Sequence, residues 1–258
     1  MQKISLLLFC FFGIVHFAFA QKTDSEKSNG YLSGAAGITN NGISLIPTFS
    51  LDKPAAIFNM SVGKSKFSFD PELTFSLKGK PWYFLFWFRY QLVTTDKFHV
   101  HVGTHLGLNF KNIVLPINAD SNEVTITERY LATELSTNYF LSQNISVGIY
   151  YLYSHGLDPT TVKNNHFVTI NANFTNINLS SKIFIGITPQ FYYLNQGEQD
   201  GFYFTSVFSL NKRNFPLSIS SVINKAIQTD IPSKDFVWNV TLTYSFAKRY
   251  FAAKKNER

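Results

Sequence analysis

The sequence predicts an all-β fold: a single antiparallel up-and-down barrel of about twelve strands that crosses a membrane. The first observation behind this prediction is the alternation of apolar and polar residues over short segments. The second is that the connectors between these segments are short and long in turn. The third is composition: 17% of residues are aromatic and 15% are charged, yet no stretch after Gln21 approaches the roughly 18 apolar residues of a spanning helix.

The connectors also give the barrel a direction. The short ones read GKSK, TTDK, LSQN, LSSK and NKRN, and the long ones include KNIVLPINADSNE, HGLDPTTVKNN and NKAIQTDIPSKD. Bacterial outer-membrane barrels place short turns in the periplasm and longer loops outside the cell. We therefore expect the amino end and the short turns on the periplasmic side, with loops 111–123, 155–165 and 224–235 outside.

Residues 1–20 are predicted to be a secretory signal peptide. Lys3 is followed by an apolar run, and the small-x-small triplet AFA precedes Gln21. A lipoprotein signal ending at Cys10 is the alternative, which Phe9 and Phe11 disfavour because small residues belong at those positions. Cys10 is the only cysteine, so disulfides and cysteine chemistry are excluded for the mature chain.

Residues 21–40 are polar and weakly patterned, and we interpret them as a periplasmic lead-in segment. The barrel is then assigned to residues 41–246 and a basic periplasmic tail to 247–258. Its clearest strand covers residues 97–110, where every second side chain is apolar. The apolar face contains Phe98, Val100, Val102, Leu106, Leu108 and Phe110, and the opposite face contains His99, His101, Gly103, His105, Gly107 and Asn109.

Residues 65–78 and 236–246 alternate in the same way. The other predicted strands are 42–51, 55–63, 82–93, 124–140, 145–154, 166–178, 183–194, 201–210 and 215–223. Pro47, Pro71 and Pro189 fall inside these segments, and we interpret them as bulges because proline lacks the donor that a closed ladder needs. Ten or fourteen strands are the alternative counts. A soluble β-sandwich is the alternative fold, but the core of a sandwich would need fewer aromatic side chains than these strands present on one face.

Three segments carry a resemblance. DFVWNVTLTYSF resembles the C-terminal strand of outer-membrane proteins of Gram-negative bacteria, whose closing aromatic, here Phe246, is part of the signal read by the barrel assembly machinery. In that family the aromatic commonly ends the chain, whereas AKRYFAAKKNER follows it here. Together with this segment, GISLIPTFSLDKPAA and KPWYFLFWFRYQL look like segments of uncharacterised outer-membrane barrels from Bacteroidota. The resemblance implies a fold and a location, and no activity.

Candidate functional residues are those that alternation directs into the lumen. We expect a polar and charged belt across successive strands, with Trp87 as a luminal aromatic or a platform for sugars. The belt contains Asp70, Glu72, Arg89, His99, His101, His105 and Glu134. Arg89 paired with Glu72 or Glu134 would form a plug, because buried charges need partners. A pore constriction lined by these charges is the alternative.

A metal site is the sharpest reading of the histidines, but His99, His101 and His105 are too widely spaced along one strand to share an ion without a neighbouring strand. We therefore assign no metal, no cofactor and no catalytic residue. An acyl hydrolase is the enzymatic alternative, with Ser154 beside His155 or His166, although the chain lacks the His-x-Ser arrangement of barrel hydrolases.

The expected function is a passive channel or a structural and binding barrel without catalysis. An outer-surface receptor for glycans or proteins, carried by the long loops, is the alternative. The net charge of +7 favours contact with anionic lipopolysaccharide or solutes over nucleic acid. The expected partners are outer-membrane lipids, lipopolysaccharide, the assembly machinery, and small solutes or glycans.

Overall fold

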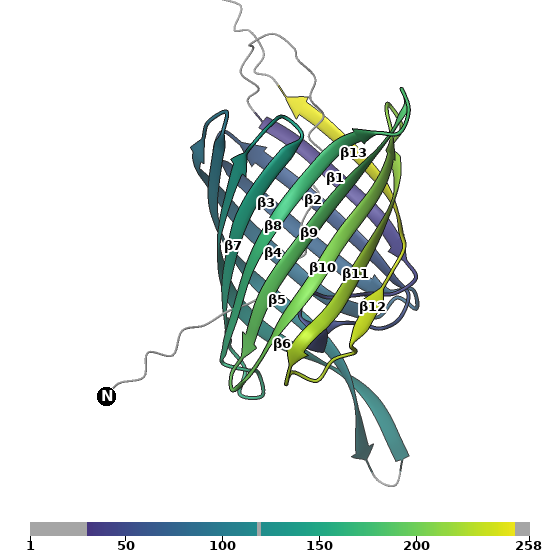
Figure 1. Ribbon diagram of the computed structural model, residues 1–258. Helices are drawn as coiled ribbons and strands as arrows, with labels where there is room; N and C mark the ends of the chain where they lie inside the picture. The colour runs from purple at the N-terminus through teal and green to yellow at the C-terminus, as the bar shows by residue number, and fades with distance from the viewer. Residues whose placement is uncertain (1–29, 118–119, 251–258) are drawn as a thin grey trace, which may run out of the picture.

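The computed structural model describes residues 30–117 and 120–250, which form a closed, tilted antiparallel barrel (Figure 1). Each strand pairs with its neighbours in the chain, and β1 pairs with β13 to close the sheet. The barrel has twelve strands, as predicted, because β12 and β13 both pair with β11 and form one interrupted strand. No helix in the described ranges is long and apolar enough to cross a membrane.

The first seven strands are β1 Gly30–Thr39, β2 Ala55–Lys64, β3 Phe67–Ser76, β4 Pro81–Thr94, β5 Phe98–Ile117, β6 Asp120–Phe140 and β7 Ile145–Gly156. The remaining strands are β8 Asn164–Asn178, β9 Ile183–Gln196, β10 Gln199–Lys212, β11 Leu217–Thr229, β12 Phe236–Trp238 and β13 Thr241–Tyr250. One short 3-10 helix, η1, covers Pro47–Phe49.

The five connectors that the sequence predicts to be short lie at one end of the barrel, the upper end in Figure 1, and the opposite end also has short turns, at residues 77–80 and 197–198. Gly30 pairs with Tyr250, so the described part of the chain begins and ends at this same end. The opposite end differs from the prediction at residues 111–123. The residues described there extend β5 and β6 into a paired hairpin that projects beyond the other strands (Figure 1), instead of forming a loop.

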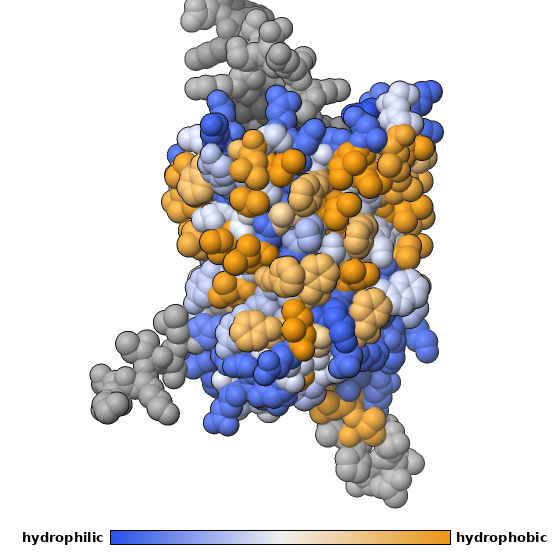
Figure 2. All heavy atoms as spheres, viewed as in Figure 1, coloured by the Kyte–Doolittle hydropathy of each residue, from blue (hydrophilic) through white to orange (hydrophobic). Residues whose placement is uncertain are grey.

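The outer surface of the barrel carries a broad apolar band with hydrophilic residues at both ends (Figure 2). Water would not solvate such a surface favourably, but the hydrocarbon of a bilayer would. Side chains of this band come from every part of the sheet. They include Phe58, Phe88, Leu106, Ile149, Ile170, Phe191, Phe202, Ile219, Leu242 and Tyr244.

The strand predicted at 42–51 is wrong, and so is the lead-in assignment of residues 30–39, which form β1. The predicted tail is wrong at residues 247–250, which belong to β13. The alternation of β1 is weak because it contains the small residues GAAG. Small residues are needed here because the Phe246 ring lies over Gly34, where an added Cβ would be only 2.8 Å from ring carbons. The first strand therefore carries little of the hydrophobic signal that marks the others.

Residues 40–54 form a loop that folds into the mouth of the barrel. Trp82 on β4 donates its indole Nε1–H to the Phe49 carbonyl at 2.7 Å, and Tyr192 on β9 donates to the Leu45 carbonyl at 3.0 Å. The Phe49 ring also packs edge-on against Tyr130 of β6, with centroids 5.6 Å apart. Since these contacts come from widely separated strands, the loop occupies the space between them.

The three prolines do not form bulges at their own positions. Pro47 begins η1 inside the loop, where no ladder bond is required. Pro71 and Pro189 lie within strands β3 and β9. Next to each proline, the pairing with one of the two neighbouring strands is interrupted, and the register is the same before and after this gap. A missing donor is thus accommodated by a local gap in pairing.

Candidate functional site in the barrel lumen

A compact charged cluster, consisting of Asp70, Arg89 and Glu134, fills one side of the lumen. These residues lie on β3, β4 and β6, and alternation directs all three side chains inward. Arg89 Nη1 is 2.9 Å from Asp70 Oδ2, and Arg89 Nε is 2.6 Å from Glu134 Oε1. One guanidinium therefore holds two carboxylates, and all three residues are buried.

Further side chains complete the hydrogen bonding of the charged cluster. Tyr150 donates its hydroxyl to Glu134 Oε2 at 2.7 Å, and His101 Nε2 lies 3.3 Å from Glu134 Oε1. Ser61 and Ser68 both donate to Asp70. Charges removed from water require partners of this kind, so the cluster is a rigid filling for this side of the barrel.

Aromatic packing extends the cluster. Trp87 and His105 lie side by side with ring centroids 4.1 Å apart, and the Arg89 guanidinium carbon is 4.5 Å from the centre of the Trp87 ring. Trp87 is inward, as predicted, but it is only 1% exposed. Its ring is part of the packed wall and is not available as a platform for sugars.

The predicted belt does not form one continuous ring. Glu72 is separate from the charged cluster and accepts a hydrogen bond from Tyr83, whereas Arg89 pairs with Asp70. His99 packs edge-on against Phe140 near the short turns, with centroids 4.7 Å apart. Thus His99, His101 and His105 have three different neighbours, and no group of three metal-ligating side chains occurs in the described residues.

Two features of the buried residues near the charged cluster were not predicted from the sequence. Glu128 accepts from Asn109, Lys111 and Tyr130, and it shares the inward parity of Glu134 on β6. Trp82 and Tyr83 are both buried because the β3–β4 register shifts between Leu73 and Phe75, which places them together opposite Thr74. Simple alternation would have placed Trp82 on the lipid face.

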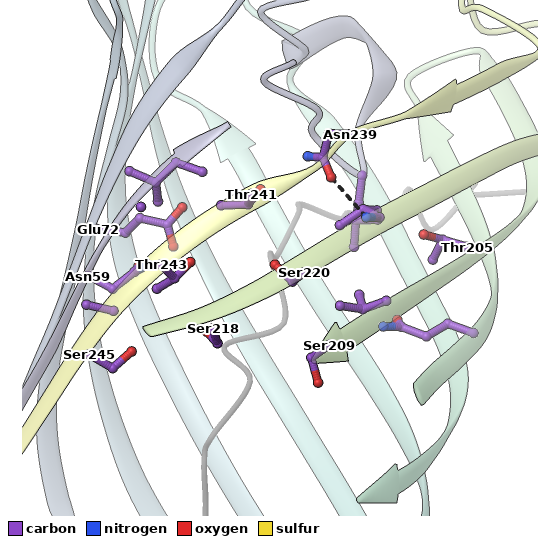
Figure 3. Close-up of a pocket in the computed structure, with 17 residues that line it drawn as sticks. Asn59, Glu72, Thr205, Ser209, Ser218, Ser220, Asn239, Thr241, Thr243 and Ser245 are labelled. Carbon is purple, nitrogen blue, oxygen red and sulfur yellow. Dashed lines mark hydrogen bonds between the residues drawn. The ribbon is translucent and has the colours of Figure 1, made fainter. Parts of the chain in front are cut away.

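A cavity of about 180 Å³ lies on the other side of the lumen (Figure 3). Part of its wall is made by serine and threonine side chains from β10, β11 and β13, which we call the hydroxyl wall, and apolar Ile57, Val207 and Val222 also line the cavity. The hydroxyl wall consists of Thr205, Ser209, Ser218, Ser220, Thr241, Thr243 and Ser245. Glu72 and Asn59 face the same cavity from β3 and β2, and Leu45 of the 40–54 loop also lines it.

The residues considered for an acyl hydrolase are not brought together. Ser154 is fully buried and pairs with inward Ala132, whereas His155 pairs with Leu131, which is 47% exposed on the outer face. His166 lies next to the hydroxyl of Tyr151, at 3.5 Å, between the inward residues Asn165 and Phe167. Serine and histidine therefore occupy opposite faces of the sheet.

Comparison with known proteins supports the fold. No family model and no curated protein matches the chain. Among solved structures, the KdgM porin is 10% identical, with 84% of this chain and 99% of that chain covered and a TM-score of 0.52. The COG4313 outer-membrane channel from Pseudomonas putida F1 is 8% identical over 88% of this chain and 100% of its own, with a TM-score of 0.49.

A third solved structure, the NanC porin, is 12% identical over 85% of this chain and 100% of its own, with a TM-score of 0.46. At these identities the likeness concerns architecture alone. This chain has the barrel fold that the KdgM porin has.

Proposed function

We propose that this protein is a passive outer-membrane channel for small polar solutes. The observation that carries the proposal is the asymmetric lumen, in which the charged cluster packs one side and the hydroxyl wall leaves a cavity on the other. A structural plug would gain stability by packing both sides. The serine and threonine hydroxyls in the cavity wall provide hydrogen bonds to a solute without holding it tightly, as conduction requires.

The 40–54 loop forms the constriction of the proposed channel. Ile43 and Ile46 are almost completely buried, and Leu45 lines the cavity at the end away from the short turns. Solutes would thus pass between this loop and the hydroxyl wall. The charged cluster fixes the shape of the opposite wall and does not itself form the path.

We also propose how the protein is exported and oriented in the outer membrane. Residues 1–20 would direct export as a signal peptide, and the short turns would face the periplasm. The apolar band supports contact with outer-membrane lipids and lipopolysaccharide, and Phe246 on β13 would contribute to recognition by the assembly machinery. The resemblance of three segments to Bacteroidota barrels suggests an envelope of that kind.

Planar-bilayer recording tests the channel. We expect discrete current steps from protein purified from outer membranes and shown to be folded by its heat-modifiable migration on gels. Folded protein that produces no current at any voltage would contradict the proposal. A current that persists after heat unfolding would identify a contaminant, so an unfolded sample is the matched control.

A second candidate function is a surface receptor. The β5–β6 hairpin projects beyond the barrel and exposes apolar Val114, which is 64% exposed. A partner protein or glycan could bind this extension. Shortening the hairpin between Ile113 and Val124 would then abolish binding to cells or envelope fractions while leaving barrel assembly intact.

A further inference from the structure

We propose that the channel conducts cations and uncharged hydroxylated solutes in preference to anions, and that the hydroxyl wall is the path they follow. This inference rests on the proposed channel function and specifies its substrate class. It contrasts with the net charge of the whole chain, which is +7. Positive charge on the molecule as a whole does not determine the charge of the path.

Buried charge inside the barrel is predominantly negative. Among the described residues, the buried charged side chains are Asp70, Glu72, Arg89, Glu128 and Glu134. Arg89 pairs with Asp70 and Glu134, and the more exposed Lys111 pairs with Glu128, so Glu72 is the one of these four carboxyl groups that forms no ion pair in the described residues. An anion that enters the lumen loses part of its hydration shell. The one buried arginine in the described part of the chain is already paired with carboxylates and so cannot compensate for this loss.

Among the described residues that line the cavity, Glu72 is the only ionisable one. The Tyr83 hydroxyl donates to its Oε1 atom and so helps to fix the position of the carboxyl group. Asn59 pairs with Glu72 across the β2–β3 ladder and faces the same cavity, and its amide offers an oxygen atom. A cation in the cavity therefore meets a carboxyl group with a neutral amide oxygen nearby, and oxygen atoms are the ligands that hard cations prefer.

The hydroxyl wall suits uncharged solutes for a different reason. Serine and threonine hydroxyls both donate and accept hydrogen bonds, so they can replace water around a polyol or a small sugar in several orientations. The wall includes Ser209, Ser218 and Ser220 on adjacent strands β10 and β11. Successive hydroxyls at similar spacing allow a solute to exchange partners step by step instead of remaining at one site.

The first experiment measures the reversal potential in a potassium chloride gradient, in mildly alkaline buffer where carboxyl groups are ionised. We expect the sign of a cation-selective pore, and Glu72→Gln should lower the cation-to-anion permeability ratio several-fold. Glu128→Gln is the matched control, since it removes a buried carboxyl group that does not line the cavity. An anion-selective wild-type pore, or an unchanged ratio in Glu72→Gln, would overturn the inference.

The second experiment locates the path. Outside Cys10 the chain has no cysteine, so Ser220→Cys introduces a single thiol in the lumen, and Ile219→Cys places one on the adjacent lipid face. We expect a cationic methanethiosulfonate to reduce the current of Ser220→Cys, and to react several-fold faster than an anionic one after correction for their rates with a free thiol. Ile219→Cys should keep its current.

These outcomes separate the two proposals. If wild-type folded protein gives no current, the channel function itself fails. If current flows but Ser220→Cys is unaffected by either reagent, the channel stands and the hydroxyl wall is not its path. If the anionic reagent reacts faster, the path is correct and the inferred cation preference is wrong.

Discussion

Arg89 Nε lies 2.6 Å from Glu134 Oε1, and this contact connects β4 to β6 across the inner face of β5. The third partner, Asp70, brings in β3. Four successive strands are thus linked by side chains as well as by their backbone ladders. This side of the barrel is therefore held more firmly than the side with the cavity.

Removal of Glu134 is expected to destabilise the barrel by about 3–5 kcal/mol, because Glu134→Ala leaves the Arg89 charge buried with half of its partners. The free energy of unfolding in urea, followed by loss of heat-modifiable gel mobility, measures the effect. The triple variant Asp70→Asn, Arg89→Met, Glu134→Leu is the control. It removes all three charges of the cluster and should lose much less stability than Glu134→Ala.

Shortening the 40–54 loop is expected to increase single-channel conductance several-fold, because the loop fills the barrel mouth through contacts with Trp82, Tyr130 and Tyr192. Replacing residues 43–50 by a short glycine-serine linker tests this in planar bilayers. A matched shortening of the β5–β6 hairpin should leave conductance unchanged. Equal conductance of the loop variant and the wild type would show that the loop is not the constriction.

Acid is expected to loosen the connector between β7 and β8. Arg129 donates to both carboxylate oxygens of Asp158, which holds the pKa of Asp158 below its ordinary value. A depressed carboxyl pKa stabilises the connector at all pH values above about 4, and this contribution is lost as the pH falls through the folded-state value. Lys163 also lies against this turn through the Asp158 carbonyl.

Limited proteolysis of the β7–β8 connector at decreasing pH measures this loosening. Cleavage between residues 157 and 163 should increase in acid for the wild type. Asp158→Asn should already show the increase at neutral pH and should respond little to acid. A wild-type connector that is equally resistant throughout would argue against a role for the Asp158–Arg129 pair.

Lipid chemistry is expected to be independent of Ser154 and His166. Because the two side chains lie on opposite faces of the sheet, they cannot share a proton during acyl transfer. Strains carrying Ser154→Ala or His166→Ala should have the same lipid A and phospholipid profiles as the wild type. A change common to both variants would revive the hydrolase alternative.

Alternation was sufficient to predict most of the fold. Residues 97–110 show why. Their apolar side chains face lipid and their polar side chains face the lumen, so the alternation in the sequence matches the alternation of outward and inward positions along the strand. The prediction failed where close packing determined the residues and the alternation of apolar and polar side chains was lost or misleading. In β1 small residues accommodate Phe246, and in residues 42–51 an apolar pattern serves packing inside the barrel mouth and not a strand.

The charged part of the lumen was partly predictable for the same reason. Asp70, Arg89 and Glu134 were expected to lie together because their side chains point inward at a similar depth in the barrel. This pattern could not show that Arg89 pairs with Asp70 and not with Glu72. That choice depends on where Tyr83 lies, and the bulge at Trp82–Tyr83 is not visible as a departure from alternation. The cavity was not predicted, because serine and threonine on an inward face give no sign of how much space lies between them.

The pairing of Gly30 with Tyr250 has a consequence for how the protein is made. A sheet that closes through its first and last strands has no unpaired edge when complete, but it cannot close before its final strand is available. Until then its lipid-facing aromatic side chains have nothing to bury against. The growing chain therefore needs protection from aggregation throughout export, and loss of the last ten residues of the sheet would leave an open edge instead of a slightly shorter barrel.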